Sequence, residues 1–565
     1  MIFDTWNHSL TSRGTRRRFP RWRSNMKMNE KEASIGRFPR NRIYKTSTGT
    51  KNSPSYKSFL FVLFGSVMIL VVSLRTSDHF APKFLRHAQK SKDAQELELE
   101  DRPGTARRLD EVFPIHVESF EEIPHPGILF SGSERVKILL SEMDIQETLM
   151  VPTFWEPDNF EAHGFRNDLD SNERQIMSLK EAQSIGSMIH GLETIFVSVA
   201  SYRDSECRPT IESIFARASH PERIRVAVVD QIEPEDPKCT EPILPCDEDP
   251  TQVLCKYKDL IDTYNVRSYL MVGPVLARHI AHRMYRNEYF AMQVDAHVRF
   301  TQGWDDDIIS QWRSTGNEMA ILTTYLTDIA DSIDPTTHKS RRADRNMMCD
   351  INYEGSANTQ KHLVLKSPAK STPSIQGTPM LHPFWSAGFS FARGHFVVQV
   401  PYDPFLPMLF QGEESSIAIR AFSYGYDFYA PERSVAFHIF AMKENISRRN
   451  RHKFWENEIL YVGALDKSLE RIVGITRMAG NMSPTKFFHE GQDMYGLGAV
   501  RKPEKYFQTY GIHPDEGRVE AHLCSIVQGG TMHREFQPHL RSDGMGINYD
   551  EVSFEFRDPF GSQRQ

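Results

Sequence analysis

The sequence predicts an α/β protein built on a largely parallel sheet. Three observations support this: short apolar runs alternate with amphipathic ones from residue 193 onward, the run 194–200 is apolar on both faces, and the following segments come in the order strand, helix, strand. A strand buried on both faces is typical of a parallel sheet covered by helices. Ligands of such sheets bind beyond the carboxyl ends of the strands, so we expect the functional site just after Ala200, Asp230 and Val294.

The individual elements follow from apolar spacing. Apolar residues three and four apart predict helices, and short apolar runs predict strands. The expected elements are a strand at 194–200, a helix carrying Ile211, Ile214, Phe215 and Ala218, strands at 223–230 and 266–272, a helix carrying Ala277, Ile280, Ala281 and Met284, and a strand at 289–294.

Composition excludes several other classes of protein. The chain has 565 residues, 39% of them apolar and 25% charged, so it is neither wholly disordered nor fibrous. The net charge of −6 conceals an asymmetry, because residues 1–58 hold 14 Lys and Arg against 3 Asp and Glu, a balance of +11 that leaves −17 for the rest. Phosphate contacts need an excess of cations, so the main body is not expected to bind nucleic acid.

A run of 17 uncharged residues, 58–74, follows the basic segment. Its length is at the short end of what crosses a bilayer as a helix, and it has no polar face. With the cations before it, it predicts a single-pass type II signal anchor in a Golgi or ER membrane, with the catalytic body in the lumen. The predicted domains are a basic cytosolic tail at 1–57, the anchor at 58–74, a stem at 75–192, a main folded domain at 193–515 and a tail at 516–565.

All six cysteines follow residue 200, in a predicted compartment where disulfides form. Six cysteines allow 15 pairings, and the sequence does not choose among them. Cys239, Cys246 and Cys255 lie in one loop rich in Pro, Asp and Glu, at spacings of seven and nine residues. This spacing favours a loop staple over a zinc site.

The motif Asp295-Ala296-His297 is the strongest chemical indication. It follows an apolar strand, and residues i and i+2 of an extended chain project to the same side, so a carboxylate and an imidazole converge there. Oxygen and nitrogen ligands together suit Mn²⁺, with Mg²⁺ or Co²⁺ as alternatives. An Asp at a strand end is more often a turn or cap residue, and it is the position after a buried strand that favours the metal.

Other motifs have plainer interpretations. No G-x-G-x-x-G or G-x-x-x-x-G-K motif supports a dinucleotide or P-loop mechanism, and 388–392 is one glycine short of a nucleophile elbow and is interpreted as a buried strand. The acidic run 305–307 precedes an amphipathic helix, so capping and the helix dipole explain it. Glu413 and Glu414 also precede a helix, and His438 stands alone in an apolar strand.

Several longer segments together resemble one enzyme family. They are 198–207 (SVASYRDSEC), 289–308 (YFAMQVDAHVRFTQGWDDDI), 382–392 (HPFWSAGFSFA), 409–431 (LFQGEESSIAIRAFSYGYDFYAP), the strand around His438, and 495–506 (YGLGAVRKPEKY). These segments resemble the hydroxyproline-directed GlcNAc-transferases, whose best-known members modify the small adaptor subunit of F-box ubiquitin ligases. The resemblance spans 193–515 and implies a GT-A type glycosyltransferase fold with a Rossmann-like sheet.

The resemblance assigns roles to residues of this chain. Asp295 and His297 match the metal-binding motif, and His438 matches the later histidine that completes the protein ligands. Glu413 and Glu414 match an acidic pair near the acceptor and the transferred sugar, and with Asp295 they are the implied catalytic residues. The implied nucleotide-sugar contacts are Ser201, Tyr202, Arg203 and Asp204 after the first strand, Asp230 near uracil or ribose, Arg278 at the pyrophosphate, and Trp385 and Gly388 beside the sugar.

The implied reaction is transfer of GlcNAc from UDP-GlcNAc to a hydroxyl group, with retention of configuration and with Mn²⁺ or another divalent cation. The implied acceptor is a hydroxyproline-bearing protein, or another protein or glycan hydroxyl, since the well-known members are cytosolic and this body is predicted to be lumenal. Two alternatives stay open. One is an enzyme like the polypeptide GalNAc-transferases that uses another UDP-sugar, and the other is a catalytically inert, membrane-tethered sugar-binding protein.

Overall fold

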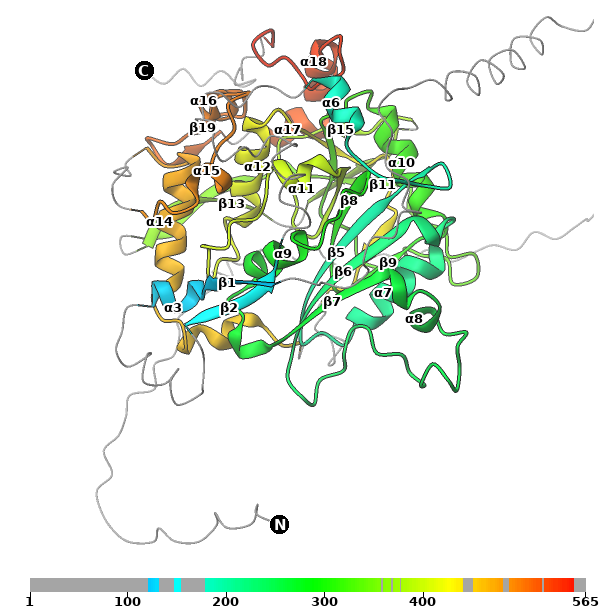
Figure 1. The fold of residues 1–565 in the computed structure, drawn as a ribbon. Coiled ribbons are helices and arrows are strands. Elements are labelled where there is room, and N and C mark those ends of the chain that lie inside the picture. Colours follow the sequence, from blue (N-terminus) through cyan, green and yellow to red (C-terminus); the bar gives the residue numbers. More distant parts are fainter. Residues whose placement is uncertain are drawn as a thin grey trace, which may run out of the picture. The chain divides into compact units, whose positions relative to one another are not determined.

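The computed structural model describes residues 120–131, 147–153, 178–356, 359–366, 369–375, 377–440, 451–480, 487–520 and 523–552. All of them belong to one unit of the chain, residues 98–565. Its centre is an eight-stranded sheet in the order β15-β17-β10-β16-β8-β5-β6-β7 (Figure 1). These strands are β15 (Met380–Leu381), β17 (Asp427–Ala430), β10 (Ala320–Thr323), β16 (Phe389–Arg393), β8 (Phe290–Asp295), β5 (Ile195–Tyr202), β6 (Ile224–Ile232) and β7 (Ile261–Arg267).

One half of the sheet is parallel. Strands β8, β5, β6 and β7 all run in the same direction, whereas β16 joins β8 antiparallel. In this register Ala200 lies opposite Asp295, and Ser201 lies opposite Asp230. The carboxyl ends of three strands therefore meet at one edge, and the predicted α/β class is confirmed as a mixed central sheet.

Helices cover both faces of the parallel half. Ile195, Val197 and Val199 of β5 pack into one apolar core with the helix α7 (Cys207–Arg217). Phe196 packs into a second core, which contains the inner face of α9 (Pro274–His282). Alternate residues of a strand point to opposite faces, so a strand that is apolar throughout joins two helical layers.

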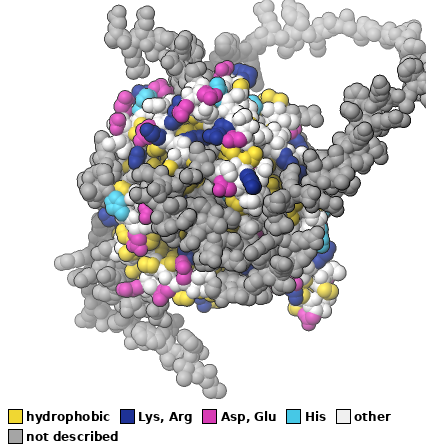
Figure 2. Space-filling model, turned by 45° about the horizontal axis from the view of Figure 1, so that its top comes forward, with side chains coloured by type: hydrophobic (Ala, Val, Ile, Leu, Met, Phe, Trp, Pro, Cys, Tyr) yellow, Lys and Arg dark blue, Asp and Glu magenta, His cyan; other side chains and the backbone are white. Residues whose placement is uncertain are grey.

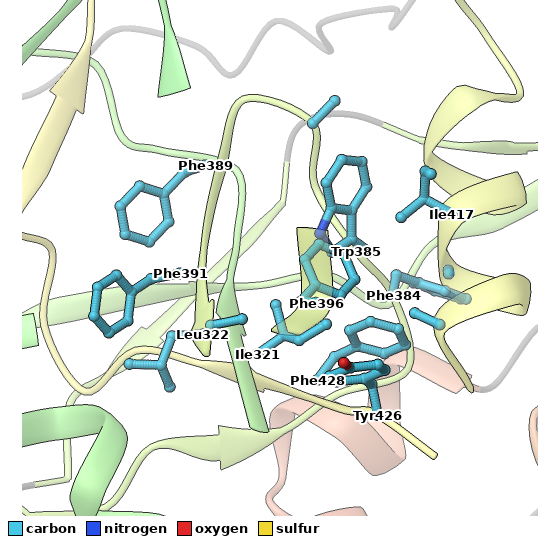
Figure 3. Close-up of a cluster of buried hydrophobic side chains, with 14 of the residues drawn as sticks. Ile321, Leu322, Phe384, Trp385, Phe389, Phe391, Phe396, Ile417, Tyr426 and Phe428 are labelled. Atoms are coloured by element: carbon cyan, nitrogen blue, oxygen red, sulfur yellow. The ribbon is translucent and has the colours of Figure 1, made fainter. Parts of the chain in front are cut away.

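The antiparallel half has a dense aromatic core. Figure 3 shows Phe389 and Phe391 of β16 beside Leu322 of β10, with Phe428 of β17 and Ile417 of the helix α12 (Glu413–Ser423) nearby. All five side chains are buried. The expected buried strand at 388–392 is therefore confirmed.

The remaining helices and strands lie around this sheet. The helices are α3 (Pro126–Phe130), α6 (Leu179–Ser184), α8 (Val253–Lys256), α10 (Trp304–Ser314), α11 (His395–Gln399), α14 (Ala464–Thr476), α15 (Gln492–Tyr495), α16 (Pro503–Thr509), α17 (Leu523–Gln528) and α18 (Thr531–Phe536). The short strand pairs are β1 (Phe120–Pro124) with β2 (Thr148–Pro152), β3 (Met188–Ile189) with β4 (Leu192–Glu193), β9 (Val298–Phe300) with β18 (Ala436–His438), β11 (Asp344–Met347) with β14 (Lys370–Pro373), β12 (Ile351–Ser356) with β13 (Thr359–Leu365), and β19 (Ile512–His513) with β20 (Arg518–Val519).

One predicted strand is misplaced. The strands expected at 194–200, 223–230 and 289–294 form, but the one expected at 266–272 lies at Ile261–Arg267 and is followed by a 3₁₀ turn. The apolar residues Met271 and Val272, which suggested a strand, are buried in the core beside α9 instead. The apolar pattern thus predicts the burial of these two residues but not their backbone conformation.

Segments on both sides of the predicted catalytic domain share its cores. Val151 of β2 is fully buried in the core that contains α9, and Ala182 and Ile185 accept hydrogen bonds from Arg393 of β16. After residue 516, the helices α17 and α18 pack on the antiparallel half of the sheet, where Phe536 is buried.

Three disulfides join the six cysteines. Cys207–Cys239 ties the start of α7 to the loop after β6, and Cys246–Cys255 closes that same loop at the spacing of nine. Cys349–Cys524 connects the catalytic body to α17 across 175 residues. The loop-staple interpretation is confirmed, and the pairing that the sequence left open is resolved.

The predicted Golgi or ER membrane localisation does not stand. Among the residues that the structure describes, no helix combines the length and the apolar character that crossing a bilayer requires. The segment 58–74, on which this prediction depended, lies outside the described residues.

Candidate active site

A pocket of about 510 Å³ opens at the edge where β5 and β8 end. The ends of these strands, the start of α9, the start of α12 and the short strand β18 all contribute to its lining. Nine of the predicted site residues line it: Tyr202, Asp204, Arg278, Asp295, His297, Gly388, Glu413, Glu414 and His438. The structure therefore brings nine of the thirteen predicted site residues together at one pocket.

Asp295, His297 and His438 converge on one point in this pocket. Their potential ligand atoms all lie within 4.8 Å of one another. The carboxylate Oδ2 of Asp295 is 3.4 Å from Nε2 of His438 and 3.9 Å from Nε2 of His297. One oxygen and two imidazole nitrogens form a donor set that suits a divalent transition-metal ion such as Mn²⁺.

Backbone pairing explains how His438 reaches a motif 141 positions earlier in the chain. The strand β18 pairs antiparallel with β9, and His438 lies opposite Val298. The amide of Ile439 donates to the carbonyl of His297 at 2.9 Å. The two imidazole rings consequently stand nearly perpendicular, with centroids 4.5 Å apart.

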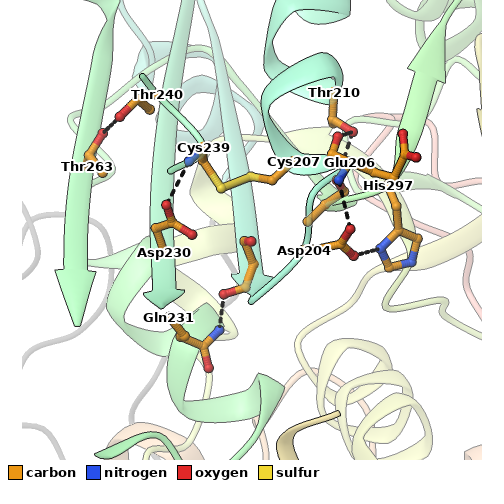
Figure 4. Close-up of a disulfide and its surroundings, with 12 residues drawn as sticks. Asp204, Glu206, Cys207, Thr210, Asp230, Gln231, Cys239, Thr240, Thr263 and His297 are labelled. Carbon is orange, nitrogen blue, oxygen red and sulfur yellow. Dashed lines mark hydrogen bonds and ion pairs between the residues drawn. A yellow bond between two sulfur atoms is a disulfide. The ribbon is translucent and has the colours of Figure 1, made fainter. Parts of the chain in front are cut away.

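Asp204 orients His297 from behind. Its Oδ2 lies 2.8 Å from Nδ1 of His297, and its Oδ1 accepts the amide of Glu206 (Figure 4). The same Oδ2 lies 3.0 Å from Nε of Arg451. A carboxylate at Nδ1 fixes the imidazole tautomer that leaves Nε2 free to bind a metal. Asp204 lies just before α7, and the disulfide at Cys207 holds the start of that helix.

Arg278 holds the carboxylates of two different elements together. Its guanidinium contacts Glu413 at the start of α12 and Asp295 at the end of β8, the latter at 3.0 Å. Burial acts to raise the pKa of Asp295, but its contacts with His438 and His297 and the positive charge of Arg278 outweigh it, so the pKa falls below its usual range. Asp295 is therefore an anionic ligand at neutral pH.

Glu414 has a different environment from Glu413. Its carboxylate accepts a hydrogen bond from the amide of Ala387 at 2.9 Å and another from the hydroxyl of Tyr325. Burial raises the pKa of Glu414 to about 7, although these hydrogen bonds act to lower it. Burial also raises the pKa of Glu413, although its ion pair with Arg278 acts to lower it.

Gly388 allows a close approach of the backbone to Asp295. A Cβ atom at this position would lie 3.0 Å from Oδ2 of Asp295, tighter than ordinary van der Waals contact. Any larger residue would displace the carboxylate oxygen that faces both histidines.

Comparison with known proteins identifies the family. The family model described as glycosyltransferase (GlcNAc) matches residues 194–252 and 244–516, more than half of the chain. The chain belongs to the GlcNAc glycosyltransferase family. The match covers the sheet, the metal motif, the acidic pair and His438, so all of the pocket elements described above lie within it.

Comparisons with solved structures give more distant similarities. The chain is 13% identical to GalNAc-T7, a structure with UDP, GalNAc and Mn²⁺, over 77% of this chain and 73% of that one, with a TM-score of 0.36. It is 14% identical to residues 1–349 of S. aureus TarS in complex with UDP-GlcNAc, over 54% and 78% of the two chains, with a TM-score of 0.27. A search of curated proteins found no match.

Four predicted nucleotide-sugar contacts do not line the pocket of this GlcNAc glycosyltransferase. Ser201 and Trp385 are buried in the protein interior. Arg203 turns away to pair with Asp236 at 2.6 Å. Asp230 is buried and accepts the amide of Cys239 at 2.8 Å (Figure 4). These four residues are therefore outside the pocket lining, and their contacts with the nucleotide sugar stay a prediction.

The acidic run at 305–307 lies in the first turn of α10, as expected, but none of its residues occupies the N-cap position. The N-cap position of α10 is Gly303. Asp305 is fully buried, pairs with Arg223 at 2.7 Å and accepts the amides of Ser219 and His220. The sequence pattern showed the helix start and could not show this tertiary ion pair.

Sequence reasoning missed several pocket residues. Tyr325 follows β10, and Arg451, Lys453 and Trp455 come from the segment before α14.

The pocket lining has no excess of positive charge by itself. It holds four carboxyl groups and three ordinarily cationic side chains, which are Asp204, Asp295, Glu413 and Glu414 against Arg278, Arg451 and Lys453. A bound divalent cation would reverse this balance in favour of a diphosphate. The basic run at 448–453 was the only sequence indication of these cations.

Proposed function

We propose that this protein transfers GlcNAc from UDP-GlcNAc to a hydroxyl group, with a divalent cation held by Asp295, His297 and His438. The observation that carries the proposal is the convergence of one carboxylate and two imidazoles in the pocket of a GlcNAc glycosyltransferase family member. We also propose that the catalytic domain has the GT-A type of α/β fold. The location of the metal motif directly after a central parallel strand supports this.

The donor diphosphate would lie between the metal ligands and the cations of the pocket. A bound Mn²⁺, or another divalent cation, would supply Lewis-acid stabilisation of the charge that develops on departing UDP. Arg278 keeps Asp295 ionised and in place, while Asp204 fixes the tautomer of His297. Arg451 and Lys453 add positive charge on the same lining. Tyr202, which ends β5 and lines the pocket, would contact the nucleotide.

The transferred sugar and the acceptor would lie on the side of the acidic pair. Glu413 is held by Arg278 and has no freedom to act as a base, so its proposed role is to orient the sugar. Glu414, with a pKa near 7, is the group suited to contact the acceptor hydroxyl. The proposed retention of configuration, by attack on the face that UDP leaves, follows from the resemblance of the sequence segments.

The proposed acceptor is a hydroxyproline-bearing protein, which follows from the resemblance of the sequence segments. Nucleic acid is not proposed as a partner. On the face in Figure 2, acidic and basic side chains are interspersed over the described surface, whereas phosphate backbones bind to continuous basic surfaces.

The test is a transfer assay with the full chain, Mn²⁺, a panel of UDP-sugars and hydroxyproline peptides. Product mass identifies the sugar, and the anomeric configuration of the product reports retention or inversion. The proposal expects transfer from UDP-GlcNAc that EDTA abolishes and Mn²⁺ restores. Preferential use of UDP-GalNAc would establish the alternative donor, and binding of UDP-GlcNAc without turnover on any acceptor would establish an inert sugar-binding protein.

A further inference from the structure

Exposed aromatic side chains form one rim of the active-site pocket. Phe410 and Trp455 both line the pocket, yet 57% and 48% of their surfaces are exposed. Their ring centroids lie 6.0 Å apart, and the ring of Phe454 lies 5.3 Å from that of Trp455. We call Phe410, Phe454 and Trp455 the aromatic shelf. Because Phe410 is three residues before Glu413, the shelf adjoins the acidic pair.

The exposed apolar surface continues along the chain from the shelf. Ile459, Val462 and Leu465, at the end of the 3₁₀ segment Phe454–Ile459 and the start of α14, are 72%, 55% and 39% exposed. Half of the large exposed hydrophobic residues in the described part of the chain belong to this region: Phe410, Phe440, Trp455, Ile459, Val462 and Leu465. Such a concentration of exposed apolar side chains marks a binding surface.

We propose that the aromatic shelf binds apolar side chains of a polypeptide acceptor beside the hydroxyl group that receives the sugar. This inference rests on the proposed function and names the class of its acceptor. The shelf is continuous with the pocket, so a residue docked on it places its neighbours at the acidic pair. Aromatic anchors flanked by aliphatic side chains are typical of peptide-binding surfaces.

The chemistry of the shelf's neighbours favours a polypeptide over a glycan. Ile459, Val462 and Leu465 have no side-chain group that hydrogen-bonds to sugar hydroxyls. Stacking of a nucleobase on the shelf is the competing use, because aromatic rings also bind bases. The shelf has neighbours at both parts of the pocket. Phe410 is three residues before Glu413, whereas Nζ of Lys453, a cation proposed for the diphosphate, lies 5.9 Å from the centroid of the Trp455 ring. The experiment separates these two uses.

The experiment measures peptide binding apart from turnover. The probes are two fluorescein-labelled peptides with one hydroxyproline each, one flanked by leucine and phenylalanine and the other by serine and glycine. Fluorescence anisotropy with the full chain, UDP and Mn²⁺ gives the affinity for each. The variants are Trp455→Ala and Phe410→Ala, and the control is Ile243→Ala, which removes an even more exposed apolar side chain that does not line the pocket.

The wild-type protein should bind the apolar peptide about tenfold or more tightly than the polar one, the scale of one aromatic anchor. Trp455→Ala and Phe410→Ala should remove most of this preference and change the affinity for UDP less than twofold, while Ile243→Ala changes neither. Equal binding of both peptides by the wild type overturns the inference. A preference that survives in both variants, or a loss of UDP affinity in place of peptide affinity, also overturns it. Shelf-dependent peptide binding without sugar transfer would refute the proposed function alone.

Discussion

Asp204→Asn tests whether the proposed metal ligand His297 depends on the carboxylate that contacts its Nδ1. The substitution keeps the shape and one acceptor oxygen, but it removes the negative charge that lies 2.8 Å from Nδ1 of His297 and 3.0 Å from Arg451. Asp204 is 6% exposed, so water does not replace the lost charge effectively. Loss of such a partner typically weakens metal binding 10- to 100-fold, or about 1.4 to 2.7 kcal/mol.

The assay is calorimetric titration of the full chain with MnCl₂ in the presence of UDP. Asp204→Asn should weaken Mn²⁺ binding by about 10- to 100-fold. Asp204→Ala should weaken it more, because alanine leaves Nδ1 of His297 without any acceptor. The matched control is Asp236→Asn, which breaks the ion pair with Arg203 near the same edge of the sheet without touching a metal ligand. Unchanged Mn²⁺ affinity in both Asp204 variants, or an equal loss in the control, would refute this role.

Three further predictions concern other carboxyl groups. Asp295→Ala should abolish transfer and Mn²⁺ binding while the circular dichroism spectrum stays that of the wild type, since this residue supplies a metal ligand and little packing; wild-type turnover with a normal metal requirement would contradict the site. Asp305→Ala should lower the free energy of unfolding in urea by about 3 to 5 kcal/mol, because it removes the buried partner of Arg223. Asp306 is half-exposed, so Asp306→Ala should lower it by about 1 kcal/mol or less. Equal losses in the two variants would argue against the buried ion pair. Burial raises the pKa of Glu414 to about 7 from 4.5. The wild type should therefore lose about 3 kcal/mol of unfolding free energy as pH rises from 4.5 through 7, and Glu414→Gln should lack that loss. Parallel pH profiles of the two proteins would show that the carboxyl group is not buried as described.

The sequence was most informative where a pattern depends on local geometry. The strand before Asp295 and the spacing to His297 predict two metal ligands facing one side, and both line the pocket. His438 could not be found in this way, because it reaches the motif only through the pairing of β18 with β9. Its role came from the resemblance of the longer segments.

The loop after β5 shows where local prediction ends. Four consecutive residues, 201–204, were expected to meet the nucleotide, but only alternate ones line the pocket. Successive side chains of an extended chain point to opposite sides, and the positive φ of Arg203, 50°, turns that residue toward Asp236. Tertiary packing therefore decides whether residues 201 and 203 or residues 202 and 204 line the pocket. The pocket residues of the loop at 451–455 follow no periodic pattern and could not be predicted.

The most direct test of the account is the position of the cation. Crystals of the full chain grown with UDP and MnCl₂ and measured at the manganese absorption edge locate the ion by anomalous scattering. We predict a single strong peak bonded to a carboxylate oxygen of Asp295 and to Nε2 of His297 and His438, in contact with the diphosphate. A peak elsewhere in the pocket, or no peak between these three side chains at saturating Mn²⁺, would contradict it.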